Sequence, residues 1–148
     1  MKKERSTKII VLTFLTMAFI IIANLSSAFA QISVVVSSSS SNTATAAQLK
    51  EMFSGSRLTW KDGTKIQIAH QPDSDTGKQF YDKFIGKTAN TVLKKWTKLS
   101  LSGQANAPVK CVNDDDVKKA VAKGKNIVGF IKTSSLDGTV KEIHKINN

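Results

Sequence analysis

Short runs of apolar, often β-branched residues alternate with amphipathic helical patterns along most of this chain. The first run, Ile32 to Val36, is unbroken, which is typical of a strand covered on both faces of its sheet. Further strand-like runs lie at residues 65–70, 108–112, 127–131 and 140–143. Because helical patterns separate most of these runs, the sequence predicts an α/β domain with a mainly parallel sheet flanked by helices.

The helices are indicated by their apolar faces and by their end signals. Thr45 and Gln48 fit a capping box that starts the first helix, and Gly55 follows its end. The serine run at residues 37–42 has the composition of a linker, but its position between a strand and a helix favours an ordered connection. A polar loop at residues 71–76 opens the next helix. The apolar positions expected to face the sheet are Leu49, Met52, Phe53, Phe80, Phe84, Ile85, Val92, Leu93, Trp96, Leu99, Val117, Ala120 and Val121.

Residues 1–30 are typical of a secretory signal rather than of a packed element. Four basic residues precede an apolar run from Ile9 to Leu25, and Ala28 and Ala30 supply the small side chains of an A-x-A cleavage site. Cleavage after Ala30 would leave residues 31–148 as one domain in the periplasm or outside the cell. The alternative is an uncleaved membrane anchor, since the apolar run is just short of a span of about 20 residues.

The chain is strongly basic, with 22 Lys or Arg against 11 Asp or Glu and a formal net charge of +11. Such a charge favours acidic partners, among them anionic solutes, lipid headgroups, cell-wall polymers and nucleic acid. A solvated lysine-rich surface is the simpler explanation. Cys111 is the only cysteine, so no internal disulfide can form, and its strand-like surroundings favour a buried free thiol.

The sequence contains no recognisable set of catalytic residues, and we expect no enzyme. His70 and His144 are the only histidines, the serines lack a Gly-x-Ser-x-Gly setting, and no His-Glu-x-x-His or paired-cysteine motif occurs. Asp114, Asp115 and Asp116 lack the glycine turn and distal glutamate of a calcium loop, and they complement the dipole of the helix that they begin. We therefore expect no metal and no cofactor. Nucleic-acid binding is not expected either, because the aromatic residues fall at core spacing.

Three segments form a recognisable set when they are taken in order. The first is residues 49–55 followed by the turn at residues 60–63, with the sequence Trp-Lys-Asp-Gly, the second is residues 66–77, and the third is residues 125–131. Together they resemble the helix with its tryptophan turn, the anion-binding loop and the Gly-Ala-Ile-Gly-Tyr strand of phosphate ABC transporter substrate-binding proteins. The resemblance covers roughly Ile32 to Ile143. It implies a single compact lobe of the periplasmic-binding-protein type, exported and non-enzymatic, which binds solute in ABC transport or derives from a protein that does.

The resemblance also implies an anion site at the helix that opens near Asp75. A helix N-terminus offers unpaired amides and a positive potential, which hydroxyl groups can supplement to hold a tetrahedral oxyanion such as phosphate. Ligands of open α/β sheets gather beyond the carboxyl ends of the strands, so the turn after the first strand is expected to contribute. The predicted ligand-binding residues are Asp73, Ser74, Thr76, Gly77, Ser38, Ser39 and Ser40.

Two residues depart from the pattern of that family. Gln71 stands where an arginine usually follows the histidine, and Asp75 stands where serine or glycine is expected. A lost cation and an added carboxylate both disfavour a dianion. A second hypothesis therefore stays open, in which the domain is a non-transport interaction module of the cell envelope that has lost its small ligand. Since one lobe leaves a ligand exposed, the expected partners are a membrane transporter, an envelope protein or a second copy of the chain.

Overall fold

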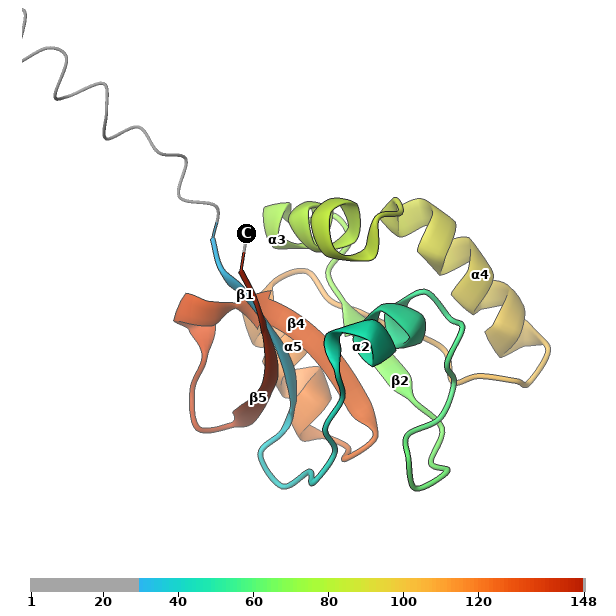
Figure 1. Cartoon of the computed structure of the whole chain (residues 1–148), viewed down its shortest axis with the longest axis horizontal. Helices are drawn as coiled ribbons and strands as arrows, with labels where there is room; N and C mark the ends of the chain where they lie inside the picture. The colour runs from blue at the N-terminus through green and yellow to red at the C-terminus, as the bar shows by residue number, and fades with distance from the viewer. Residues whose placement is uncertain (1–29, 148) are drawn as a thin grey trace, which may run out of the picture.

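The computed structural model describes residues 30–147, and it shows a five-stranded sheet with helices on both faces (Figure 1). The predicted signal segment, apart from Ala30, lies outside the described residues. The strands are β1 (Ile32–Ser37), β2 (Gln67–His70), β3 (Val109–Lys110), β4 (Ile127–Lys132) and β5 (Val140–Ile146). The helices are α2 (Ala46–Phe53), α3 (Asp75–Gln79), α4 (Ala89–Leu101) and α5 (Asp114–Ala122), with a π-helical segment η1 (Phe80–Ile85) and a 3₁₀ turn η2 (Thr133–Ser135).

The sheet is mixed, with the strand order β3-β2-β4-β1-β5. β2 pairs in parallel with β3 and β4, whereas β1 is antiparallel to both of its neighbours, β4 and β5. The expectation of a mainly parallel sheet therefore holds for the half around β2 and fails around β1. The sequence pattern does not reveal this reversal, because a strand that is buried along its whole length has the same composition in either direction.

Successive strand residues point to opposite faces, so the sheet carries two hydrophobic cores. The first core lies under α2, η1 and α4, and the second lies under α5. Val34 and Val36 belong to the first core, while Val35 between them belongs to the second. In the first core Phe80 stacks on Phe130 with 3.9 Å between the ring centroids. The close contact between η1 and β4 fixes the helix that follows the predicted anion loop.

The serine run after β1 is an ordered turn, as its position predicts. The Ser40 amide donates to the carbonyl oxygen of Ser37 at 2.9 Å. The Ser40 hydroxyl and the Asn42 side chain both donate to the carbonyl oxygen of Lys125, at 3.0 and 2.9 Å. These bonds tie the turn to the segment that leads into β4.

Within residues 30–147, none of the helices combines the length and the apolar character needed to cross a membrane.

Candidate functional site

The carboxyl ends of β2, β3 and β4 lie along one edge of the sheet, because these strands are parallel. A hollow of about 350 Å³ opens at this edge, and we call it the edge pocket. The N-termini of α3 and α5 meet there, since their N-cap residues Ser74 and Asn113 both line the hollow. Its full lining is Gln71, Ser74, Asp75, Thr76, Val112, Asn113, Asp114, Asp115, Lys132 and Ser135. A site at this place is what an open α/β sheet favours.

Two of the predicted ligand residues, Ser74 and Gly77, form a hydrogen bond with each other inside the loop. The Ser74 hydroxyl accepts a hydrogen bond from the Gly77 amide at 2.9 Å and donates to the carbonyl oxygen of Gln71 at 2.9 Å. A Cβ atom on Gly77 would lie only 1.9 Å from that same carbonyl oxygen, so the loop and the first turn of α3 approach as closely as glycine allows. Ser74 and Gly77 therefore shape the site more than they offer donors to a ligand.

Thr76 is the second predicted ligand residue, with Ser74, in the lining of the edge pocket. Its side chain is largely buried. Asp73 lies outside the lining and forms an ion pair with Lys110 at 2.9 Å, and the hydrogen bond and charge of that lysine lower the pKa of the Asp73 carboxyl group. Asp75 lines the mouth, with its carboxylate 3.7 Å from the ammonium group of Lys78.

Ser38, Ser39 and Ser40 do not belong to this site. β1 is antiparallel to β4, with Ile32 opposite Lys132 and Val36 opposite Val128. The turn after β1 therefore lies at the edge of the sheet where β4 begins, opposite the edge pocket. Figure 1 shows this turn and α3 at opposite ends of the sheet. The expectation that these serines join the loop around Asp75 is wrong, because it assumed that β1 runs parallel to β2.

Asp114 is the residue at this edge whose role the sequence did not indicate. Its Oδ1 accepts from Nε2 of Gln71 at 2.6 Å, and its Oδ2 accepts from the hydroxyl of Ser135 at 2.7 Å and from the amide of Lys132 at 3.2 Å. By sequence it appeared only as one of three acids that complement a helix dipole. Only the parallel pairing of β2 with β3 and β4 brings these partners together.

The charges around the edge pocket do not favour a dianion. Asp75, Asp114 and Asp115 line it, against Lys132 as the cationic side chain in the lining. The carboxylate of Asp115 lies 3.0 Å from the ammonium group of Lys118. Within the described part of the chain, no group of three or more His, Cys, Asp or Glu side chains is arranged to hold a metal ion.

Cys111 and His70 are neighbours, but they lack the chemistry of a nucleophile and its base. The Cys111 amide donates to the carbonyl oxygen of His70 at 2.8 Å. Burial raises the pKa of the Cys111 thiol to about 11, and burial with the nearby charge of Lys110 lowers the pKa of His70 to about 4. Both shifts favour the neutral forms, whereas a Cys-His nucleophile needs a thiolate.

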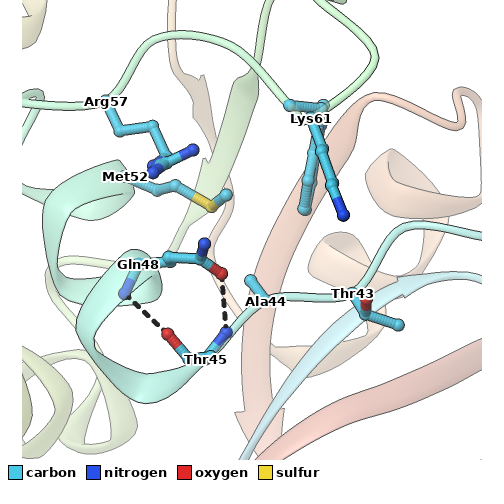
Figure 2. A pocket seen from close by; sticks show the side chains of 8 residues that line it. Thr43, Ala44, Thr45, Gln48, Met52, Arg57 and Lys61 are labelled. Atoms are coloured by element: carbon cyan, nitrogen blue, oxygen red, sulfur yellow. Dashed lines mark hydrogen bonds between the residues drawn. The ribbon is translucent and has the colours of Figure 1, made fainter.

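A larger hollow of about 530 Å³ lies beside the N-terminus of α2 (Figure 2). Its lining is Thr43, Ala44, Thr45, Gln48, Met52, Arg57, Trp60 and Lys61, and it contains none of the predicted ligand residues. Thr45 and Gln48 cap the helix by bonding to each other, and Nε of Arg57 lies 3.2 Å from the carboxylate of Glu51. Its best-placed polar groups thus already have partners.

Comparison with known proteins finds likeness in structure only, since no protein-family model and no curated protein sequence matches the chain. An ABC-type phosphate transport receptor from Vibrio cholerae is 23% identical with a TM-score of 0.60, over 77% of this chain and 47% of the receptor. PstS from Borrelia burgdorferi is 16% identical with a TM-score of 0.54, over 76% of this chain and 46% of its own. The chain thus spans less than half the length of these solved structures. It has the fold of one part of phosphate ABC transporter substrate-binding proteins.

Proposed function

We propose that this chain is an exported, non-catalytic binding protein of the solute-binding type, in or derived from an ABC transport system. It holds a small oxyanion such as phosphate in the edge pocket. The observation that carries the proposal is the meeting of two helix N-termini, those of α3 and α5, in one hollow beyond the carboxyl ends of parallel strands. Amides at helix N-termini stabilise anions, and the two solved structures compared above are an ABC-type phosphate transport receptor and PstS.

The proposed site is expected to bind weakly. It is an open hollow on a chain less than half as long as the proteins it resembles in structure, so a bound ion stays in contact with water. A dissociation constant near 1 mM, equivalent to about 4 kcal/mol, is a reasonable expectation for such a site. Tighter binding requires a partner that closes over the ion, and a transporter subunit, an envelope protein or a second copy of the chain could supply it.

The direct test is the melting temperature of the purified protein against phosphate, sulfate and phosphonates at fixed ionic strength. A ligand at ten times its dissociation constant stabilises the native state by about 1.4 kcal/mol, which raises the melting temperature of a domain of this size by about 5 °C. A saturable shift with one of these anions supports the proposal. No shift with any of them, up to 100 mM, rejects it.

Thr76→Val should weaken that anion response by about tenfold without unfolding the domain, because it removes a hydroxyl group from the pocket and keeps the side-chain volume. Thr97→Val, at an exposed position on α4, serves as the matched control. Titration calorimetry with phosphate measures both variants. Equal affinities for Thr76→Val and the unmodified protein would remove the α3 loop from the site.

A second candidate is an interaction module of the cell envelope that has lost its small ligand. The observation that favours it is the trio of carboxylates in the edge pocket, Asp75, Asp114 and Asp115. This candidate predicts that the lysine-rich surface binds an acidic polymer, lipid or protein, with affinity that falls as salt is added. It also predicts no stabilisation by any single small anion, so the melting experiment separates the two candidates.

A further inference from the structure

The carboxylate of Asp114, in the lining of the edge pocket, accepts hydrogen bonds from three donors. Its three donors come from three separate segments, which are the residue after β2, the last residue of β4 and the turn η2. In sequence they are 43, 18 and 21 residues away from Asp114. A side chain that only complemented its own helix dipole would have no need of these distant partners.

The two following acids show what such a local role looks like. Asp115 lies 3.0 Å from the ammonium group of Lys118, one turn further along α5. Asp116 accepts a hydrogen bond from the amide of Val112, four residues earlier, at 3.3 Å. Both serve the start of α5 through neighbours in sequence, whereas Asp114 reaches into the pocket.

The groups that donate to Asp114 have no free hydrogen for a second acceptor. The amide group of Gln71 has two hydrogens, and its nitrogen donates to Asp114 at 2.6 Å and to the carbonyl oxygen of Phe130 at 3.1 Å. The Ser135 hydroxyl and the Lys132 amide each have one hydrogen, and each donates it to Asp114. Because Gln71 is buried, its side chain cannot turn outward to recruit another partner.

We propose that Asp114 acts as a built-in occupant of the oxyanion position in the edge pocket, so that an external anion binds only in competition with this side chain. A carboxylate and a phosphate, sulfate or formate ion accept the same kind of donor in similar geometry. The inference rests on the proposed function, which places the anion site in the edge pocket. It adds that competition from the Asp114 carboxylate limits the affinity of that site. Removal of the Asp114 carboxylate converts the donors from Gln71, Lys132 and Ser135 into a vacant site for a small oxyanion.

The test is chemical rescue of Asp114→Ala. This variant keeps Cβ and lacks a carboxylate group, so formate can replace the missing atoms. In chloride the variant should melt below the unmodified protein. Formate and phosphate should restore the melting temperature saturably, with an affinity for phosphate at least tenfold above that of the unmodified protein.

Asp115→Ala is the matched control, since it removes the same charge from the adjacent residue of the same pocket lining. Its gain in phosphate affinity should be at least threefold smaller than that of Asp114→Ala, because it removes a charge from the pocket but frees no donor there, and formate should not rescue it. An equal gain in both variants would mean that net charge alone governs binding, and it would overturn the proposal. Absence of rescue in a folded Asp114→Ala would overturn it as well.

Asp114→Ser covers the case in which the alanine variant does not fold. Its hydroxyl group is polar like the carboxylate but too short to reach the positions of Oδ1 and Oδ2, so the donors of Gln71, Ser135 and Lys132 stay free for an anion. It should bind phosphate at least tenfold more tightly than the unmodified protein, as measured by calorimetry. An affinity equal to that of the unmodified protein rejects the inference.

The outcomes also separate this inference from the proposed function. If the unmodified protein binds no anion and the Asp114 variants do, the inference holds and the proposed function fails for the natural chain. If the unmodified protein binds phosphate and the Asp114 variants bind it no better, the proposed function stands and the inference fails.

Discussion

The loop at residues 71–76 depends on a close backbone approach that only glycine at residue 77 permits. The carbonyl oxygen of Gln71 points at Gly77 so closely that a Cβ atom there would lie 1.9 Å away. The same carbonyl oxygen accepts a hydrogen bond from the Ser74 hydroxyl, which in turn caps the first turn of α3. The position of α3 relative to β2 therefore depends on glycine at residue 77.

Gly77→Ala should destabilise the domain by about 3 kcal/mol, because the loop has to move away from α3 to make room for the added methyl group. Gly138→Ala is the control, since a Cβ atom there has no neighbour within 4 Å, and it should change the free energy of unfolding by less than about 0.5 kcal/mol. Urea denaturation measures both. Equal stabilities of the two variants would contradict the close approach.

His70 makes the stability of the domain depend on pH. Burial, with the charge of Lys110 adding to it and that of Asp73 opposing it, lowers the pKa of His70 from 6.5 to about 4. Between these two pH values the unfolded chain binds more protons than the native state. The free energy of unfolding should therefore fall as the pH is lowered from about 6.5 to about 4, by up to about 3 kcal/mol in total.

Urea denaturation at several pH values between 7 and 4.5 measures this slope. His70→Leu should flatten it, because no group at this position then gains a proton on unfolding. A flat profile in the unmodified protein would mean that His70 titrates normally.

Of the predicted ligand residues, Ser74 and Thr76 line the edge pocket. The pattern behind their prediction, a capping hydroxyl at the start of a helix, is visible within a few neighbouring residues. Asp114 was missed because its partners Gln71 and Ser135 are 43 and 21 residues away, and only the sheet topology brings them together. The placement of Ser38 to Ser40 failed for the same reason.

Among the elements, α2 begins where a local sequence motif predicts that it begins. The capping box predicted from Thr45 and Gln48 is present in both directions (Figure 2), with the Thr45 amide donating to Oε1 of Gln48 at 3.0 Å and the Gln48 amide donating to Oγ1 of Thr45 at 3.3 Å. These bonds need no partner beyond the first turn of the helix. A sequence motif is therefore sufficient to fix the start of this element.

Thr45→Ala should lower the free energy of unfolding by about 1 kcal/mol, because it leaves the amide of Gln48 without its acceptor. Thr43→Ala lies two residues earlier in the exposed connection and should be neutral within about 0.5 kcal/mol. Thermal melts compare the two. A loss of the same size in both would show that the cap contributes little.

The segment η1 shows where helical periodicity misleads. The sequence predicted one helix after the loop at residues 71–76, with Phe80, Phe84 and Ile85 on its buried side. In the structure the last turns are π-helical, with the Gly86 amide donating to the carbonyl oxygen of Tyr81 at 2.9 Å. The wider turn buries Tyr81 completely and leaves Ile85 half-buried. A periodicity of 3.6 residues could not predict this shift.

At the scale of the whole molecule, the two hydrophobic cores share their strands residue by residue. Val34 and Val35 are neighbours in β1, yet they pack into opposite cores, and Val128 and Ile127 in β4 do the same. Because the same strands form one wall of each core, unfolding of the sheet would disrupt both cores together. The domain is therefore expected to unfold as one cooperative unit, although its two cores are separated by the sheet.

Two native probes report on the two cores. Trp60 and Trp96 lie in the first core, and Cys111 lies in the second. In a urea titration, tryptophan fluorescence and labelling of Cys111 by a thiol reagent should show the same midpoint within error. Exposure of Cys111 at a lower urea concentration than the tryptophan transition would mean that the α5 side opens on its own.

The reversed direction of β1 has a practical consequence for anyone who handles this protein. Ile32 lies opposite both Lys132 and Ile146, and the carbonyl oxygen of Gln31 accepts a hydrogen bond from the Thr133 amide at 2.8 Å. Both ends of the described chain therefore emerge at the end of the sheet where Lys132 lines the edge pocket. Figure 1 shows β1 beginning close to the point where β5 ends. An affinity tag, fluorophore or surface linker attached at either end would crowd the pocket. Immobilisation through the turn at Gly138, where β5 begins on the opposite edge, would keep the pocket free.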